Sequence, residues 1–329
     1  MSEAEKFEDY DQLTGGRAAV TVLALILGLA APIYGLHEHL NLRTGAFQSP
    51  TYEYPILLPA LYLAMFIGTI AFLSSLMRLR RAGVLWRHIL AIIAFVAAAA
   101  AGTASLLAGF GYQWEWWSLE QALFGVLPSA VFVSLYALLL VFFWAILSVT
   151  TRSRSGLWPA GMAAVIALVT FLVPFNQSIR ARSLPPIHDI TTDMAAPPEF
   201  VNALSVRLAS SANPATYAGD DIADLQAEFY PDIQPIVLRK NPKEVLSRSL
   251  RVIKQQGWEV IAVSPQEGRI EAVDTTFWFG FKDDVVIRVR PVEGGTRVDI
   301  RSKSRIGVSD LGTNADRIRR FSKALLTER

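Results

Sequence analysis

The residues best suited to bind or transform a ligand lie near the C-terminus, where alternating charges lead into a glycine-containing loop. Arg297, Asp299, Arg301 and Lys303 alternate with apolar or small residues, so a strand here places the four charges on one face. The following loop, residues 305–314, reads Arg-Ile-Gly-Val-Ser-Asp-Leu-Gly-Thr-Asn and leads into a helix. Glycines allow close approach to backbone amides, which attract anions at a helix start.

This pattern predicts a site for a phosphate or carboxylate group, because an arginine beside free amides adds a two-pronged donor. The candidate ligand-binding residues are Arg288, Arg301, Arg305, Ser309, Asp310 and Asn314. Two structural alternatives stay open. The strand charges are more typical of an ion-pair ladder with Asp299 between arginines on a solvated face. In the loop, Asp310 could instead pair with Arg305 while Thr313 or Asn314 caps the helix.

Hydrolysis is a weaker hypothesis for the same region. His188 is the one histidine after residue 175, so a Ser-His-Asp arrangement needs it together with Ser309 and either Asp189 or Asp310. The chain has no G-x-S-x-G nucleophile elbow. We therefore assign no catalytic residue.

Metal and cofactor binding have little support in the sequence. Asp220, Asp221 and Asp224 are close together and Asp283 adjoins Asp284, but neither group has the spacing of a calcium loop. The first group is more typical of a helix start, where carboxylates suit the helix dipole. The chain has no cysteine, which excludes thiol-ligated zinc and iron–sulfur clusters. No metal site and no cofactor are predicted.

These residues are attached to a strongly apolar N-terminal half. Hydrophobic residues make up 52% of the chain and charged residues 18%, which is unlike an ordinary soluble protein. Five uncharged runs are each long enough to cross a hydrocarbon core about 30 Å thick. They are Ala18–Leu36, Tyr54–Met77, Ile89–Phe110, Gly125–Val149 and Leu157–Phe175.

The distribution of basic residues predicts the orientation of these five transmembrane helices. Eight Lys and Arg residues flank the spans on the side of the N-terminus and three on the other side. Cytoplasmic flanks carry the excess of Lys and Arg. We therefore expect a multi-pass protein of the inner (plasma) membrane with a cytoplasmic N-terminus and a periplasmic C-terminal domain. The formal net charge of +2 argues against a nucleic-acid partner.

We divide the chain into a polar segment (1–16), a five-helix transmembrane domain (17–175), a linker (176–198) and an extracytoplasmic α+β domain (199–329). The extended stretch from Ser183 to Asp193, with Pro197 and Pro198 after it, predicts a stiff, exposed tether. The fold class is thus membrane α-helical plus an α+β domain, whose four-stranded antiparallel meander is flanked by helices.

Turn and capping residues define the elements of that domain. The expected strands are Trp258–Val263, Arg269–Thr275, Asp284–Arg290 and Thr296–Ser302. Asn241 and Pro242 predict a helix start and Gly257 its end. Helices also begin near Pro198 and Thr313.

The same patterns predict which side chains are buried. The expected buried residues of the helix near Pro198 are Phe200, Val201, Leu204 and Leu208, and those of the last helix are Ile318, Phe321 and Leu325. The four basic residues of the last helix are expected to face water: Arg317, Arg319, Arg320 and Lys323. Phe277, Phe279 and Phe281 are expected on one buried strand face, with Trp278 on the other.

Several segments resemble an uncharacterised bacterial family known only as domain of unknown function 1499. The stretch from Val298 to Phe321, with its S-R-x-G-x-S-D-x-G-x-N string, carries most of the similarity. Tyr230-Pro-Asp-Ile-Gln-Pro, Phe281-Lys-Asp-Asp-Val-Val-Ile-Arg and Pro185-Pro-Ile-His-Asp-Ile-Thr-Thr-Asp also look like that family. The resemblance covers about residues 183–327 and implies a domain that works at a membrane surface, with no established activity.

The sequence therefore favours a non-enzymatic integral membrane protein. Its extracytoplasmic module would bind a partner protein or an anionic envelope lipid, and its transmembrane helices the lipid bilayer. One alternative is an envelope enzyme that acts on an anionic substrate through the loop region from Arg301 to Asp310. A second is an accessory subunit of a larger membrane complex.

Overall fold

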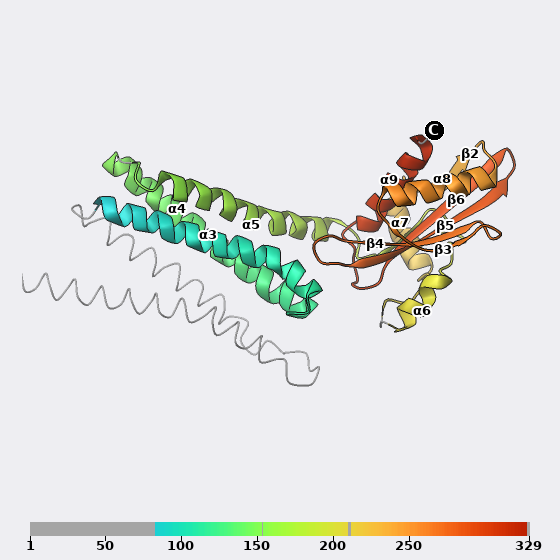
Figure 1. Cartoon of the computed structure of the whole chain (residues 1–329), viewed down its shortest axis with the longest axis horizontal. Helices are drawn as coiled ribbons and strands as arrows, with labels where there is room; N and C mark the ends of the chain where they lie inside the picture. The colour runs from blue at the N-terminus through green and yellow to red at the C-terminus, as the bar shows by residue number, and fades with distance from the viewer. Residues whose placement is uncertain (1–82, 153, 210–211, 328–329) are drawn as a thin grey trace, which may run out of the picture. The chain divides into compact units, whose positions relative to one another are not determined.

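The computed structural model describes residues 83–152, 154–209 and 212–327 (Figure 1). The chain divides into two compact units between Pro174 and Phe175, and each is considered by itself. The polar segment 1–16 and the predicted spans Ala18–Leu36 and Tyr54–Met77 lie outside the described residues.

Three helices of the described residues are long and apolar enough to cross a membrane. They are α3 (Gly83–Gln113), α4 (Leu127–Thr151), which continues the short π-helix η1 (Gln121–Val126), and α5 (Leu157–Ser183). The predicted spans Ile89–Phe110 and Leu157–Phe175 lie within α3 and α5, and Gly125–Val149 lies within η1 and α4 together. Small residues mediate their packing, because Ala91, Ala94 and Ala98 of α3 are buried in one cluster with Ala160 and other alanines of α5. Small side chains let helix backbones approach closely in a bilayer.

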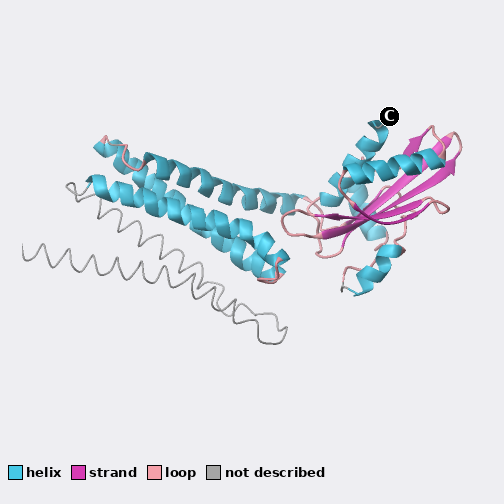
Figure 2. Cartoon of the chain, in the orientation of Figure 1, coloured by secondary structure: helices cyan, strands magenta, loops and turns pink. Residues whose placement is uncertain are grey.

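The second unit is an α+β domain built on one antiparallel sheet of six strands (Figure 2). The strand order is β1-β6-β5-β4-β3. β2 also pairs with β6, at residues 296–298, whereas β1 pairs with residues 301–303. The strands are β1 (Asp189–Thr191), β2 (Ile236–Leu238), β3 (Glu259–Ser264), β4 (Arg269–Thr275), β5 (Lys282–Val292) and β6 (Gly295–Ser304). The helices are α6 (Asn202–Ala209), α7 (Asp220–Phe229), α8 (Pro242–Gln255) and α9 (Thr313–Thr327).

The predicted four-stranded meander is confirmed as β3–β6, but the sheet also has two strands that the prediction lacked. β1 and β2 have three residues each, which is too short to show the alternation that identifies a strand. The expectation of an exposed tether before the domain is wrong for its second half. Ile187 and Ile190 are fully buried, and Asp189 to Thr191 pair with β6.

The apolar face of the sheet is covered by α8 and α9, as the sequence predicts. Asn241 caps α8, its side chain accepting a hydrogen bond from the Glu244 amide at 2.9 Å. Trp258 stacks on Phe321 of α9 with ring centroids 5.9 Å apart. Arg317 departs from the prediction: it is fully buried rather than facing water, because Asp274 and Asp283 pair with it beneath α9.

On the other face of the sheet lies α6 (Figure 1), and the side chains that it buries are not those predicted. Phe200 is buried as expected, but Val201, Leu204 and Leu208 are exposed. The buried side chains of α6 are Ala203 and Arg207. The sheet beneath presents carboxylates, so the arginine of α6 faces inward and its leucines face outward.

The aromatic run is also arranged differently from the prediction. Thr276 to Phe281 form the turn between β4 and β5 rather than a strand, so strict alternation does not apply. Phe279 is buried while Phe277 is 85% exposed. The Thr276 amide donates to the Phe281 carbonyl at 2.9 Å and closes the turn.

Candidate anion-binding site

Charged side chains line the face of the sheet that α6 covers. The antiparallel register sets Asp284 opposite Lys303, Arg288 opposite Asp299 and Arg290 opposite Arg297. Cross-strand partners share a face, so these charges form one continuous ladder. The basic side chains pair with different aspartates and so form separate clusters. These clusters differ in their exposure to solvent.

The first cluster is centred on Asp189 of β1 and is closed to solvent. Arg301 donates to both carboxylate oxygens, Nε to Oδ1 and Nη2 to Oδ2, each at 2.8 Å. Lys303 Nζ donates to Oδ2 at 2.9 Å. All three side chains are at most 4% exposed. The guanidinium of Arg301 also lies over the rings of Phe200 and Tyr217, at 4.9 and 5.4 Å from their centroids.

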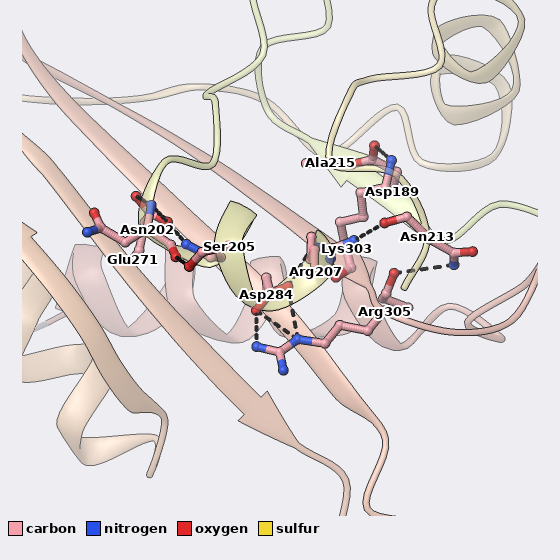
Figure 3. Close-up of polar contacts among 12 residues, drawn as sticks. Asp189, Asn202, Ser205, Arg207, Asn213, Ala215, Glu271, Asp284, Lys303 and Arg305 are labelled. Carbon is pink, nitrogen blue, oxygen red and sulfur yellow. Dashed lines mark hydrogen bonds and ion pairs between the residues drawn. The ribbon is translucent and has the colours of Figure 1, made fainter. Parts of the chain in front are cut away.

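The second closed cluster is centred on Asp284 of β5 (Figure 3). Arg207 of α6 donates from Nε to Oδ2 at 2.6 Å, and Arg305 donates from Nη2 to Oδ1 at 2.7 Å. Asp284 is fully buried. The cluster fixes α6 to the sheet, because Arg207 also donates to the carbonyl of Lys303 at 2.7 Å.

Burial shifts the titration of these closed groups. It lowers the pKa of Lys303, and the nearby Asp189 opposes this shift. It likewise lowers the pKa of Arg207, and Asp284 opposes that shift. Burial, with a smaller effect of Asp189, raises the pKa of Tyr217 to about 12. Desolvation disfavours the charged form of each group.

A buried carboxylate also holds the start of α6 (Figure 3). Glu271 of β4 accepts hydrogen bonds from the amides of Val201, Asn202 and Ala203 at 2.9–3.1 Å. It pairs as well with Arg269. This glutamate therefore occupies the anion-binding position at the N-terminus of the helix.

The third cluster lies near the β5–β6 hairpin and is open to solvent. Arg288, Arg290 and Arg297 each donate from Nη2 to the same oxygen, Asp193 Oδ2, at 3.0, 2.9 and 2.8 Å. Their side chains are 25%, 40% and 28% exposed. The buried Asp299 carboxylate pairs with the same three arginines from beneath. We call these five residues the arginine cluster.

Asp193 reaches this cluster from an irregular segment rather than from a strand or helix. Its other carboxylate oxygen accepts a hydrogen bond from the Ala196 amide at 3.1 Å. Arg288 donates to the Ala196 carbonyl at 2.8 Å. The position that an external carboxylate would take among the arginines is thus filled by a side chain of the protein.

The loop that the sequence singled out is also filled from within. The Asp310 carboxylate accepts from the amides of Gly312 and Asn314 at 2.8 and 2.7 Å, so it caps α9. Arg305 pairs with Asp284 and not with Asp310. Burial raises the pKa of Asp310, and its bonds to the two amides oppose this shift.

The six candidate residues therefore do not form one site. Arg301 and Arg305 belong to the two closed clusters, Arg288 belongs to the arginine cluster, and Asp310 caps a helix. Asn314 accepts from Ser302 Oγ at 2.6 Å and donates to the His188 carbonyl at 3.0 Å, on the opposite face of the sheet. Ser309 Oγ accepts from the Leu311 amide at 3.3 Å.

The side chains needed for hydrolysis are engaged elsewhere. The Nδ1 atom of His188 lies 3.4 Å from the carbonyl of Val308, and burial lowers the pKa of the imidazole. Asp189 binds Arg301 and Lys303, and Asp310 binds backbone amides. Within residues 83–327, apart from those left undescribed, no group of three or more His, Asp or Glu residues could hold a metal ion.

Sequence reasoning found part of the arginine cluster, because the alternative of an ion-pair ladder with Asp299 between arginines is confirmed by the pairs of Asp299 with three arginines. The alternation of β5 and β6 already placed Arg288, Arg290 and Arg297 on one face, and that signal was available. Asp193 was assigned to a tether, and no local pattern connects it with residues about a hundred positions later. No role was predicted for Arg207, because the expected inward face of α6 was the apolar one with Leu204 and Leu208.

Comparison with known proteins adds a family but no activity. No curated protein matches the chain. A family described as protein of unknown function (DUF1499) matches residues 189–325, which run from the first residue of β1 into α9. Residues 189–325 of this chain are therefore a DUF1499 domain, with the six-stranded sheet and its charged face inside the matched region.

Proposed function

We propose that this protein is a membrane-anchored binding module whose C-terminal domain takes up a carboxylate group at the arginine cluster. The observation that carries the proposal is the convergence of three partly exposed arginine side chains on one oxygen of Asp193. Guanidinium groups bind carboxylates through strong, directional, charge-assisted hydrogen bonds. The cluster already holds the chemical group that we propose as its ligand.

The charge of the cluster supports an exchange of Asp193 for a ligand. Three arginines face two aspartates, and Asp299 alone leaves two positive charges unbalanced when Asp193 departs. Each arginine reaches solvent, so an external carboxylate approaches without first unfolding the sheet. By contrast, the partners of Asp189 are buried and give no such access.

The apolar helices and their flanking charges support a location for this module. Three described helices are suited to a membrane, and the excess of basic residues beside the predicted spans lies on the side of the N-terminus. We therefore place the domain outside the cytoplasm, at the inner membrane. Its ligand is then a carboxylate of the envelope, carried either by a small acid or by an acidic segment of a partner protein.

Calorimetric titration of the full chain in lipid nanodiscs tests the proposal. Succinate and a hexa-aspartate peptide serve as probes, and stronger binding of one of them identifies the source of the carboxylate. Asp193→Asn removes the carboxylate that competes with the probe. In the wild type, only molecules with Asp193 displaced can bind, and the affinity is reduced by that fraction; the variant is expected to recover this loss. Arg290→Gln removes one charge-assisted bond of about 1.5–3 kcal/mol, so affinity falls by about tenfold or more.

Arg320→Gln is the matched control, because Arg320 is exposed on α9, away from the arginine cluster. It removes the same charge and leaves the cluster intact, so binding stays at the wild-type level. The proposal is wrong if Asp193→Asn binds neither probe. It is equally wrong if Arg290→Gln and Arg320→Gln weaken binding to the same extent.

A further inference from the structure

Two neighbouring loops at one end of the sheet carry four apolar side chains, two of them exposed and two half-buried. The β4–β5 turn carries Phe277 and Trp278, and the β6–α9 loop carries Ile306 and Val308. Phe277 is 85% exposed and Val308 is 78% exposed. We call these four residues the tip surface. The loops are adjacent, because the Arg305 amide donates to the Lys282 carbonyl at 3.0 Å, next to the paired residues Asp283 and Ser304.

Hydrogen bonds and ring contacts hold the aromatic turn in shape. Thr276 Oγ1 accepts from the Phe281 amide at 2.9 Å, and the Gly280 amide donates to the Thr276 carbonyl at 2.9 Å. Gly280 has φ +66°, a conformation that favours glycine. The buried Phe279 stacks on Phe281 within the turn, with ring centroids 5.1 Å apart. The exposed Phe277 is therefore presented by an ordered turn.

The chain enters the domain at this same end of the sheet. The last turns of α5 belong to the second unit, where Arg180 pairs with Asp316 of α9 at 2.7 Å. Only residues 184–188 separate α5 from β1, whose first residue, Asp189, pairs with Lys303 near the end of β6. Because α5 is suited to a membrane, this end of the sheet is the one closest along the chain to a bilayer.

The residues at the end of α5 have the chemistry of a membrane interface. Ile179 is about half exposed, and the exposed Arg180 and Arg182 follow it within one turn. Long basic side chains after an apolar stretch extend to the lipid headgroups. Lys282, beside the aromatic turn, is also exposed. Aromatic and basic side chains thus occur at the end of the sheet where the chain enters it after α5, as in interfacial anchors.

We propose that the tip surface docks on the headgroup interface of the bilayer that α5 spans. Phe277 and Val308 enter the boundary between headgroups and acyl chains, and Lys282 and Arg182 contact lipid phosphates. This contact fixes the orientation of the domain. The arginine cluster then faces away from the lipid, since β5 extends by about 26 Å from Lys282 to Arg290 at about 3.3 Å per residue.

Spin labels on single cysteines test this docking directly, because the natural chain has no cysteine to interfere. We place the label at Phe277→Cys and at Val308→Cys of the full chain in phosphatidylglycerol–phosphatidylcholine nanodiscs. The matched control is Val237→Cys, an exposed valine on β2, which pairs with the end of β6 remote from the tip surface. Collision with oxygen and with a water-soluble nickel complex reports the surroundings of each label. Thermal unfolding confirms that each variant is folded.

Docking on lipid predicts that labels at positions 277 and 308 lose access to the nickel complex and keep access to oxygen. The label at position 237 stays accessible to the nickel complex. Equal nickel access at all three positions overturns the proposal. Loss of access to both reagents at positions 277 and 308 also overturns it, because the tip surface is then covered by protein.

Discussion

The closed Asp189 and Asp284 clusters and the open arginine cluster have the same chemistry, on one face of one sheet, but a different relation to water. In the closed clusters, the paired side chains are at most 4% exposed except for Arg305, which is 14% exposed. These pairs connect β1 and α6 to the rest of the sheet. In the arginine cluster, the guanidinium groups reach solvent and the aspartate that they share comes from an irregular segment. Charge pattern alone therefore does not identify a binding site, because access to water separates structural ion pairs from exchangeable ones.

Physical chemistry explains why only the open pairs can exchange. Removing one partner of a buried pair leaves a charge without solvent and costs several kcal/mol. An exposed arginine that loses a carboxylate regains water, so the cost is small. The following predictions test this contrast, from the largest expected effect to the smallest.

Asp284→Ala has the largest effect, because it leaves Arg207 and Arg305 without the carboxylate that both bind. We expect a loss of about 3–5 kcal/mol in the unfolding free energy of the domain. That loss is a large part of the stability of an ordinary domain, which is about 5–15 kcal/mol. Limited proteolysis of the full chain along a urea gradient measures it.

The matched control for this prediction is Asp232→Ala, which breaks the exposed ion pair with Arg319. Exposed pairs contribute about 0–1 kcal/mol, so this variant stays close to the wild type. If the two alanine variants lose the same stability, burial does not distinguish the clusters.

Asp193→Asn has a smaller effect on stability and a larger one on binding. Asp299 still neutralises part of the charge of the three arginines, which also remain hydrated. We expect a stability loss smaller than that of Asp284→Ala, because Asp193 is only 8% exposed but the three arginines that it pairs with reach water. The same urea gradient measures this loss. A loss as large as that of Asp284→Ala would show that the ion pairs of Asp193 are structural, like those of the closed clusters.

Tyr217 provides a pH test of the closed region. Its pKa of about 12 in the folded domain exceeds the ordinary value of 10.0, because the phenolate is poorly solvated. Between pH 10 and 12 the unfolded chain releases this proton and the folded domain keeps it, so the unfolding free energy falls as the pH rises. Tyr217→Phe removes this contribution, and its stability changes less steeply over that range. Identical slopes for the two proteins would show that the phenol is hydrated in the folded domain.

Arg290→Gln has the smallest effect on stability. Arg290 is the most exposed of the three arginines, and both aspartates keep their bonds to Arg288 and Arg297. We expect a change below about 1 kcal/mol in the unfolding free energy. A larger loss would give Arg290 a structural role and weaken its use in the binding experiment.

The longer elements of the domain could be predicted from the sequence because each carries a local signal. Asn241, Pro242 and Gly257 delimit α8, and the alternation in Arg269–Thr275 coincides with β4. The start of α7 at Asp220 also agrees with the acidic residues there. The expected spans that fall in the described residues correspond to α3, α4 and α5.

The candidate site could be predicted only in part, because its decisive contacts join distant segments. The sequence identified the charged face of β6 and the arginine at position 288. It could not show that Asp189 and Asp193 pair with arginines on this face of the sheet. Nor could it show that α6 buries Arg207 against Asp284 instead of burying its leucines. Both arrangements depend on the desolvation of paired charges across about 80 to 110 positions of the chain.

Displacement of Asp193 by a carboxylate is the central claim, and hydrogen–deuterium exchange of the full chain in nanodiscs measures it. When Asp193 leaves the arginines, the Ala196 amide loses its acceptor, Asp193 Oδ1. At saturating succinate, deuterium uptake therefore increases in residues 193–199 and is unchanged in β1. Unchanged or reduced uptake in residues 193–199 would contradict the account, because the carboxylate would then leave Asp193 in place.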